Sequence, residues 1–250
     1  MNKAHYSETY YKSISGPSKI AAERILPHLD EAIHPASIVD VGCGAGAWLE
    51  VWARALGKTD LVGIDGSHVD EDQLLIPRDV FQPRDVSERF ELPRTFDLAM
   101  ALEVAEHLDP GKSEQFVDNL VRLSDRVLFS AAPPGQGGRN HINERPHTYW
   151  KELFERRGYS TFDYVRPHAL QFAELEPWFR YNPLLFVKES ACASLPEQVL
   201  RTRLAKGAPV KDLSPIAWRG RKLILSKMPV AIVSALSDLK HRATVLFGGA

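Results

Sequence analysis

Short apolar runs alternate with amphipathic stretches over the first 190 residues of the chain. Apolar runs of this length are typical of strands that are buried on both faces, and the stretches between them have helical periodicity. The pattern therefore predicts a parallel sheet covered by helices on both faces. The expected strands are residues 37–42, 61–65, 96–102 and 126–131, with a terminal pair near 160–165 and 184–187, and the expected helices are 47–55, 112–123 and 148–156.

The pattern changes after Val187, where four prolines divide the rest of the chain into short segments. Proline is tolerated at the start of a helix but not in its interior, so these segments are predicted to be short helices. We accordingly expect a domain at residues 1–190 and a helical C-terminal extension at residues 191–250. The prolines are Pro196, Pro209, Pro215 and Pro229.

Charge separates the same two parts. The whole chain has a formal net charge of -1, which gives no reason to expect a nucleic acid partner. Residues 193–250, however, hold ten basic and three acidic residues, whereas residues 1–192 carry a net charge of -8. A solvated basic face or an oligomer contact is the simpler interpretation of this extension, and a surface for membranes or anionic substrates is the alternative.

Cysteine content and hydropathy bear on the compartment. Cys43 and Cys192 are too few for a disulfide framework, and the first residues lack the apolar core of a signal peptide. No apolar run reaches the ~18 residues of a membrane span. The sequence thus predicts a cytosolic protein.

A glycine-rich loop follows the first predicted strand. It reads Val39-Asp40-Val41-Gly42-Cys43-Gly44-Ala45-Gly46 and opens a predicted helix. Glycines allow a sharp turn and leave no Cβ between the backbone and a ligand. Asp65 lies nineteen residues beyond Gly46, at the end of the second strand, where a carboxylate can accept both hydroxyls of a ribose. Loop and acid together predict a nucleoside site.

Four motifs in order resemble those of the class I S-adenosylmethionine-dependent methyltransferases. The glycine loop is similar to their first motif, and Ile64-Asp65-Gly66-Ser67 to their second. Arg84-Asp85-Val86 lies where the family places an acid beside adenine, and residues 96–107 resemble the fourth strand and the edge of the reaction pocket. The resemblance spans residues 6–188. It implies an α/β, Rossmann-like, doubly wound sheet of seven mostly parallel strands, followed here by the helical extension.

The resemblance also assigns roles to residues of this chain. Gly42, Gly44 and Gly46 would pack under the methionine part of the cofactor, while Asp40 would order the loop or bind the amino group. The remaining cofactor contacts would be Asp65 and Gly66 at the ribose, Asp85 and Val86 at the adenine, Leu102 at the pocket edge and Tyr11 closing from the N-terminal segment. Asp85 also suits the cap of a turn, which is an equally good interpretation.

Methyl transfer to a hydroxyl needs a base, and an imidazole is available as a proton acceptor near neutral pH. His141 lies in a long glycine-rich loop after the fifth strand and is the first candidate. His107 follows the fourth strand and is the second candidate. Both positions are at the carboxyl ends of strands, where open α/β sheets bind ligands. Glu103 is expected to position the reacting groups.

Glu103-x-x-Glu106-His107 raises a further possibility. If a helical turn starts at Glu103, residues i, i+3 and i+4 share a face, and together with His141 they could bind Mg2+ or Mn2+. This arrangement is similar to that of metal-dependent 2′-O-methyltransferases acting on small-RNA ends. In the alternative, the glutamates cap the next helix and His107 packs beside the cofactor.

We therefore expect an S-adenosylmethionine-dependent O-methyltransferase whose partner is a polar small-molecule acceptor, sugar-like or a secondary metabolite. The alternatives are a metal-dependent ribose methyltransferase on RNA ends, an N-methyltransferase, and a noncatalytic membrane-associated module. The basic extension keeps a peripheral membrane or oligomer contact open.

Overall fold

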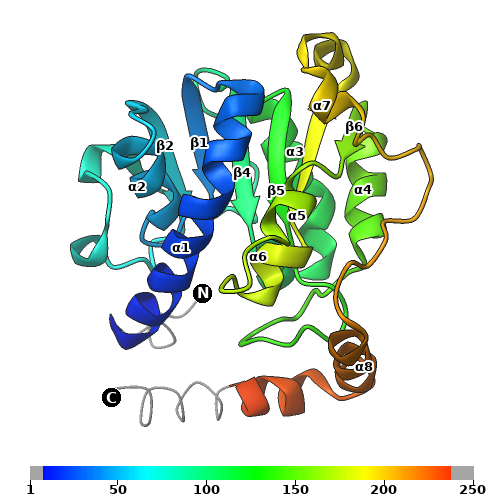
Figure 1. Cartoon of the computed structure of the whole chain (residues 1–250). Coiled ribbons are helices and arrows are strands. Elements are labelled where there is room, and N and C mark those ends of the chain that lie inside the picture. Colours follow the sequence, from blue (N-terminus) through cyan, green and yellow to red (C-terminus); the bar gives the residue numbers. More distant parts are fainter. Residues whose placement is uncertain (1–7, 238–250) are drawn as a thin grey trace.

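The computed structural model describes residues 8–237, with side chains from residue 15 onward. Its centre is a seven-stranded sheet in the order β3-β2-β1-β4-β5-β7-β6 (Figure 1). The first five strands in this order pair in parallel, whereas β7 runs antiparallel to both β5 and β6. The predicted Rossmann-like architecture is confirmed. The strands are β1 (Ser37–Val41), β2 (Asp60–Asp65), β3 (Phe81–Pro83), β4 (Leu98–Leu102), β5 (Arg126–Ser130), β6 (Tyr159–Phe162) and β7 (Leu184–Lys188).

Helices cover both faces of the sheet because neighbouring strand residues point to opposite sides. Ile38, Met100 and Leu128 pack with α1, α2, α5 and α6, while Val39 and Phe129 pack with α3 and α4. Two apolar cores result, one on each face. The helices are α1 (Glu8–Ile33), α2 (Ala47–Arg54), α3 (Ser113–Leu123), α4 (His147–Glu155), α5 (Val165–Ala169), α6 (Pro177–Tyr181), α7 (Glu197–Leu200) and α8 (Ile216–Leu225).

Helices α1, α5 and α6 and strand β3 were absent from the prediction. Helix α1 contains Pro17 and Pro27, which obscure its helical signal. Strand β3 has only three residues, fewer than a periodic pattern requires. None of the helices in residues 8–237 combines the length and hydropathy needed to cross a membrane.

Candidate active site

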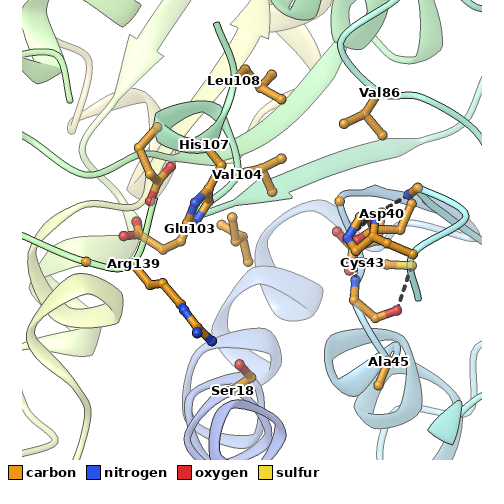
Figure 2. A pocket seen from close by; sticks show the side chains of 18 of the residues that line it. Ser18, Asp40, Cys43, Ala45, Val86, Glu103, Val104, His107, Leu108 and Arg139 are labelled. Carbon is orange, nitrogen blue, oxygen red and sulfur yellow. Dashed lines mark hydrogen bonds and ion pairs between the residues drawn. The ribbon is translucent and has the colours of Figure 1, made fainter. Parts of the chain in front are cut away.

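A cavity of about 730 Å³ lies at the carboxyl ends of the parallel strands. Figure 2 shows Asp40 and Cys43 on one side of it, with Glu103, His107 and Arg139 on the other. The first side is made by the turns after β1 and β2, and the second by the segment after β4 and the loop after β5. The predicted site residues among its lining are Asp40, Gly42, Gly44, Asp65, Gly66, Asp85, Val86, Leu102, Glu103, Glu106, His107 and His141.

The glycines of the first loop have different roles. Gly44 has φ +55° and lines the cavity, and a Cβ built on it would meet no atom within 4 Å. Gly46 does not line the cavity, because its α-carbon faces Ile76, whose side chain a Cβ would approach to 2.8 Å. Gly42 is similarly close to Val104, which a Cβ would approach to 2.3 Å. Of the three, Gly44 leaves its backbone open to a ligand, and Gly46 permits packing below it.

Asp65 joins the ends of β1 and β2. Its Oδ2 accepts a hydrogen bond of 2.7 Å from the Gly44 amide, and its Oδ1 accepts one of 2.6 Å from the Gly66 amide. Burial raises the pKa of Asp65, which these amides and nearby His68 oppose. Burial and the Asp65 carboxylate together raise the pKa of Asp40 to about 8. We therefore expect Asp40 to keep its proton to a higher pH than an ordinary aspartate does.

Asp85, which is expected to bind the adenine, also completes a turn. Its Oδ1 accepts hydrogen bonds from the Ser87 amide at 2.9 Å and the Ser87 hydroxyl at 2.6 Å. The hydroxyl bond is the main cause of the lowered pKa of Asp85. Both interpretations of Asp85 are thus compatible with one position, because this turn residue also lines the cavity. The side chain of Tyr11 lies outside the described residues.

Glu103 departs from the expected helical turn. The turn is a 3-10 turn over Ala105–His107, and Glu103 precedes it with φ 56°. The spacing i, i+3, i+4 consequently does not apply to Glu103. Its carboxylate accepts hydrogen bonds from Gln136 Nε2 at 2.8 Å and Asn182 Nδ2 at 3.0 Å. Glu103 therefore links the loop after β5 to the segment before β7.

Glu106, His107 and His141 do come together, with one ligand atom from each lying within 4.8 Å of the others. Both Glu106 carboxylate oxygens and His107 Nδ1 are buried without a hydrogen-bond partner. Burial and the neighbouring Glu103 raise the pKa of Glu106, whereas burial and nearby His141 lower the pKa of His107 to about 3. The carboxyl group of Glu106 and the two imidazoles offer oxygen and nitrogen atoms of the kind that bind divalent transition metals.

Glu144 holds His141 and is a residue that the sequence reasoning missed. His141 Nδ1 lies 3.0 Å from Glu144 Oε1. The same carboxylate accepts two hydrogen bonds of 2.7 Å, one at Oε2 from the Gly135 amide and one at Oε1 from the Gly137 amide. The signal was present in the spacing His141-x-x-Glu144 behind a glycine-rich loop. The structure thus contains a histidine and carboxylate pair at the edge of the cavity.

The comparisons with known proteins agree with this fold. Residues 17–163 match the family model of the methyltransferase domain. A search of the curated proteins finds no match. Magnesium protoporphyrin IX methyltransferase from Synechocystis PCC 6803, solved with bound SAM, is 16% identical, with a TM-score of 0.50 over 73% of this chain and 85% of its own. The plantazolicin methyltransferase BpumL, solved with SAH, is 16% identical, with a TM-score of 0.50 over 72% and 88%.

The residues present fit the cofactor that this family uses. Gly44 offers an open backbone surface, and Asp65 stands beside it at the end of β2, where a ribose diol can be bound. The cavity also extends beyond the loop to His107 and His141. The family match covers more than half of the sequence. The chain therefore belongs to the methyltransferase domain family and is an S-adenosylmethionine-dependent methyltransferase.

Proposed function

We propose that this enzyme methylates a hydroxyl oxygen of a polar small molecule, with His141 as the general base. The observation that carries the proposal is the pair formed by His141 and Glu144 at the cavity edge. A nitrogen acceptor can react through its own lone pair, whereas an alcohol must lose its proton. An oriented imidazole is thus better matched to oxygen than to nitrogen.

The cofactor side would be formed by the β1 and β2 turns. S-adenosylmethionine supplies an electrophilic methyl group when bound, so the protein has to align the acceptor and remove its proton. The Asp65 carboxylate would accept the ribose hydroxyls. Asp85 uses only Oδ1 in its bonds to Ser87, which leaves Oδ2 for the adenine amine.

Glu144 determines which nitrogen of His141 is free. When the Glu144 carboxylate accepts a hydrogen bond from the Nδ1–H group, Nε2 carries a lone pair and can take a proton from the acceptor hydroxyl. The same carboxylate then stabilises the imidazolium that forms. The amides of Gly135 and Gly137 fix Glu144 in turn. The loop after β5 therefore supplies both the base and its support.

The acceptor side of the cavity is polar, which supports a sugar-like or secondary metabolite acceptor. Glu103, Gln136 and Arg139 line it, and Figure 2 shows the Arg139 side chain reaching toward Ser18 of α1. Polar groups of this kind orient hydroxylated ligands in mostly preformed pockets.

The test is methyl transfer to a panel of hydroxylated acceptors and their amine counterparts. We expect transfer to a hydroxyl, and we expect His141→Ala to lower turnover at least about a hundredfold, since general base catalysis typically contributes that much. The affinity for S-adenosylhomocysteine should stay within about twofold. Wild-type turnover in His141→Ala, or methylation of amines alone, would exclude this function.

A second candidate function uses a cation at Glu106, His107 and His141. The buried oxygens of Glu106 and Nδ1 of His107 have no partner, and a divalent ion would satisfy them. Such an ion would lower the pKa of the acceptor hydroxyl and orient it. In that case Mn2+ titrated into the protein gives a saturable calorimetric signal that Glu106→Gln abolishes. Full turnover after chelation, with no heat from Mn2+, would leave the His141 base as the sole candidate.

A further inference from the structure

Helix α8 exposes large apolar side chains, whereas one of its basic residues, Lys222, is buried. Ile216, Leu223 and Ile224 are 81%, 62% and 64% exposed. Lys222 is buried and pairs with Asp212 at 2.7 Å, and Arg221 donates a hydrogen bond of 2.9 Å to the Gln136 carbonyl. A surface helix normally packs its apolar stripe on the body of the protein. The outward face of α8 is therefore available to something other than this chain's own core.

The apolar surface continues into the helical residues 230–237. Eleven large apolar side chains are exposed among the described residues, and seven of them lie between Ile216 and Leu236. Exposed apolar side chains gathered in this way mark an interaction surface, whereas scattered ones do not. We call residues 215–237 the arm. Its remaining exposed apolar residues are Met228, Val230, Ile232 and Leu236.

The charge of the arm points to an anionic partner. It holds four basic residues, Arg219, Arg221, Lys222 and Lys227, and no acidic residue. Arg219 and Lys227 are exposed alongside the apolar side chains. Apolar residues flanked by basic ones are the features of a helix that lies in the interface of an anionic bilayer. With ten residues, α8 is too short to cross a hydrocarbon core of about 30 Å.

The arm is also seated on the active-site loop. A Cβ on Gly135 would lie 1.8 Å from the Lys222 carbonyl oxygen, so only glycine permits this contact. A Cβ on Gly137 would lie 3.0 Å from Val233, and Ser237 lines the cavity. Gly135 and Gly137 are the residues whose amides hold Glu144. Figure 1 shows the arm crossing the end of the molecule toward which the parallel strands point.

We propose that the arm docks on an anionic phospholipid surface. Ile216, Leu223 and Ile224 enter the headgroup region, and Arg219 and Lys227 pair with lipid phosphates. Because the arm rests on the loop that carries His141 and Glu144, docking places the acceptor side of the cavity beside the bilayer. This inference rests on the arm and holds whatever molecule is methylated.

The test is flotation of the full chain with vesicles. We expect binding to phosphatidylcholine vesicles that contain 30% phosphatidylglycerol, at least about tenfold weaker binding to pure phosphatidylcholine, and weaker binding in 0.5 M salt. Leu223→Ser with Ile224→Ser should reduce binding about tenfold or more, since both side chains are already exposed and their loss leaves the core intact. Ile20→Ser, which alters an exposed apolar residue of α1, is the control and should bind as wild type.

Three results would overturn the proposal. The first is the absence of binding to the anionic vesicles, and the second is binding that the double substitution leaves unchanged. The third is a lipid-free dimer in sedimentation that the double substitution dissociates, because a second copy would then cover the apolar face. Thermal unfolding of each variant shows whether it is folded, and S-adenosylhomocysteine binding reports on the cofactor site separately from docking.

Discussion

Replacing Glu144 by glutamine tests the proposed support of the general base. Three N–H donors converge on the two carboxylate oxygens of Glu144: the amides of Gly135 and Gly137, and Nδ1 of His141. Glutamine has one oxygen and one NH2 group, so in either orientation at least one donor faces another donor. Alternatively, the His141 ring changes tautomer and carries its proton on Nε2, and this nitrogen can then no longer take a proton from the acceptor.

The magnitude follows from the hydrogen bond that the substitution removes. One unsatisfied buried donor costs about 1–3 kcal/mol, which corresponds to a fall in kcat/KM of about 5- to 150-fold if the cost is felt in the transition state. A change of tautomer would extend the loss beyond this range, because it removes the base itself. The affinity for S-adenosylhomocysteine should change by less than about twofold, since Glu144 lies on the loop after β5 and not on the loop after β1.

Turnover and the protonation of His141 provide independent readouts. Turnover is measured by release of S-adenosylhomocysteine, and 15N NMR of the His141 ring shows which nitrogen carries the proton without any acceptor present. The control is Glu152→Gln, which changes an exposed glutamate of α4. If Glu144→Gln keeps wild-type turnover, or if wild-type His141 carries its proton on Nε2 alone, the proposed pair is not the base.

Two further predictions concern the glycine-rich loop after β1 and Asp40, which precedes this loop in the chain. Gly44→Ala should weaken S-adenosylhomocysteine binding at least about tenfold, because its methyl group enters the cavity, whereas Gly46→Ala should cost about 1–3 kcal/mol more in unfolding free energy than Gly44→Ala, because it meets Ile76. Equal effects of the two in both calorimetry and denaturant unfolding would contradict this division of roles. Because the pKa of Asp40 is raised to about 8, the folded protein retains a proton that the unfolded chain releases. The free energy of unfolding of the ligand-free protein should therefore fall as pH rises from about 5 to about 8. This group contributes at most about 1.4 kcal/mol per pH unit to that fall. Asp40→Asn should flatten that slope in urea unfolding measured across this pH range, and parallel slopes would show that Asp40 does not hold the proton.

The strands and the nucleoside loop were predictable because their signals are local. Val39, Val41 and the glycines that follow them combine an apolar run with a turn that needs left-handed backbone, and Asp65 ends the next run. Parallel strands bring such ends to one edge of a sheet, so their proximity follows from the topology. Local pattern and topology together were therefore enough to bring Gly44 and Asp65 to the same side of the cavity.

The geometry of the acceptor side depends on contacts between distant segments, which a local pattern does not encode. Asn182, just before β7, binds Glu103, seventy-nine residues earlier in the chain, and this contact removes Glu103 from the expected cation cluster. The left-handed φ of Glu103 also breaks the helical spacing on which that expectation relied. Glu144 was missed because its role depends on how the Gly135 to Gly137 loop folds back on it.

Calorimetric titration of S-adenosylhomocysteine into the wild-type protein and into Asp65→Asn addresses the cofactor site most directly. We predict one binding site per chain in the wild type and an affinity at least about tenfold lower in Asp65→Asn, because the uncharged amide accepts the ribose hydroxyls less strongly than the carboxylate does. Absence of binding heat in the wild type, or equal affinity in the two proteins, would show that the nucleoside does not bind at the ends of β1 and β2.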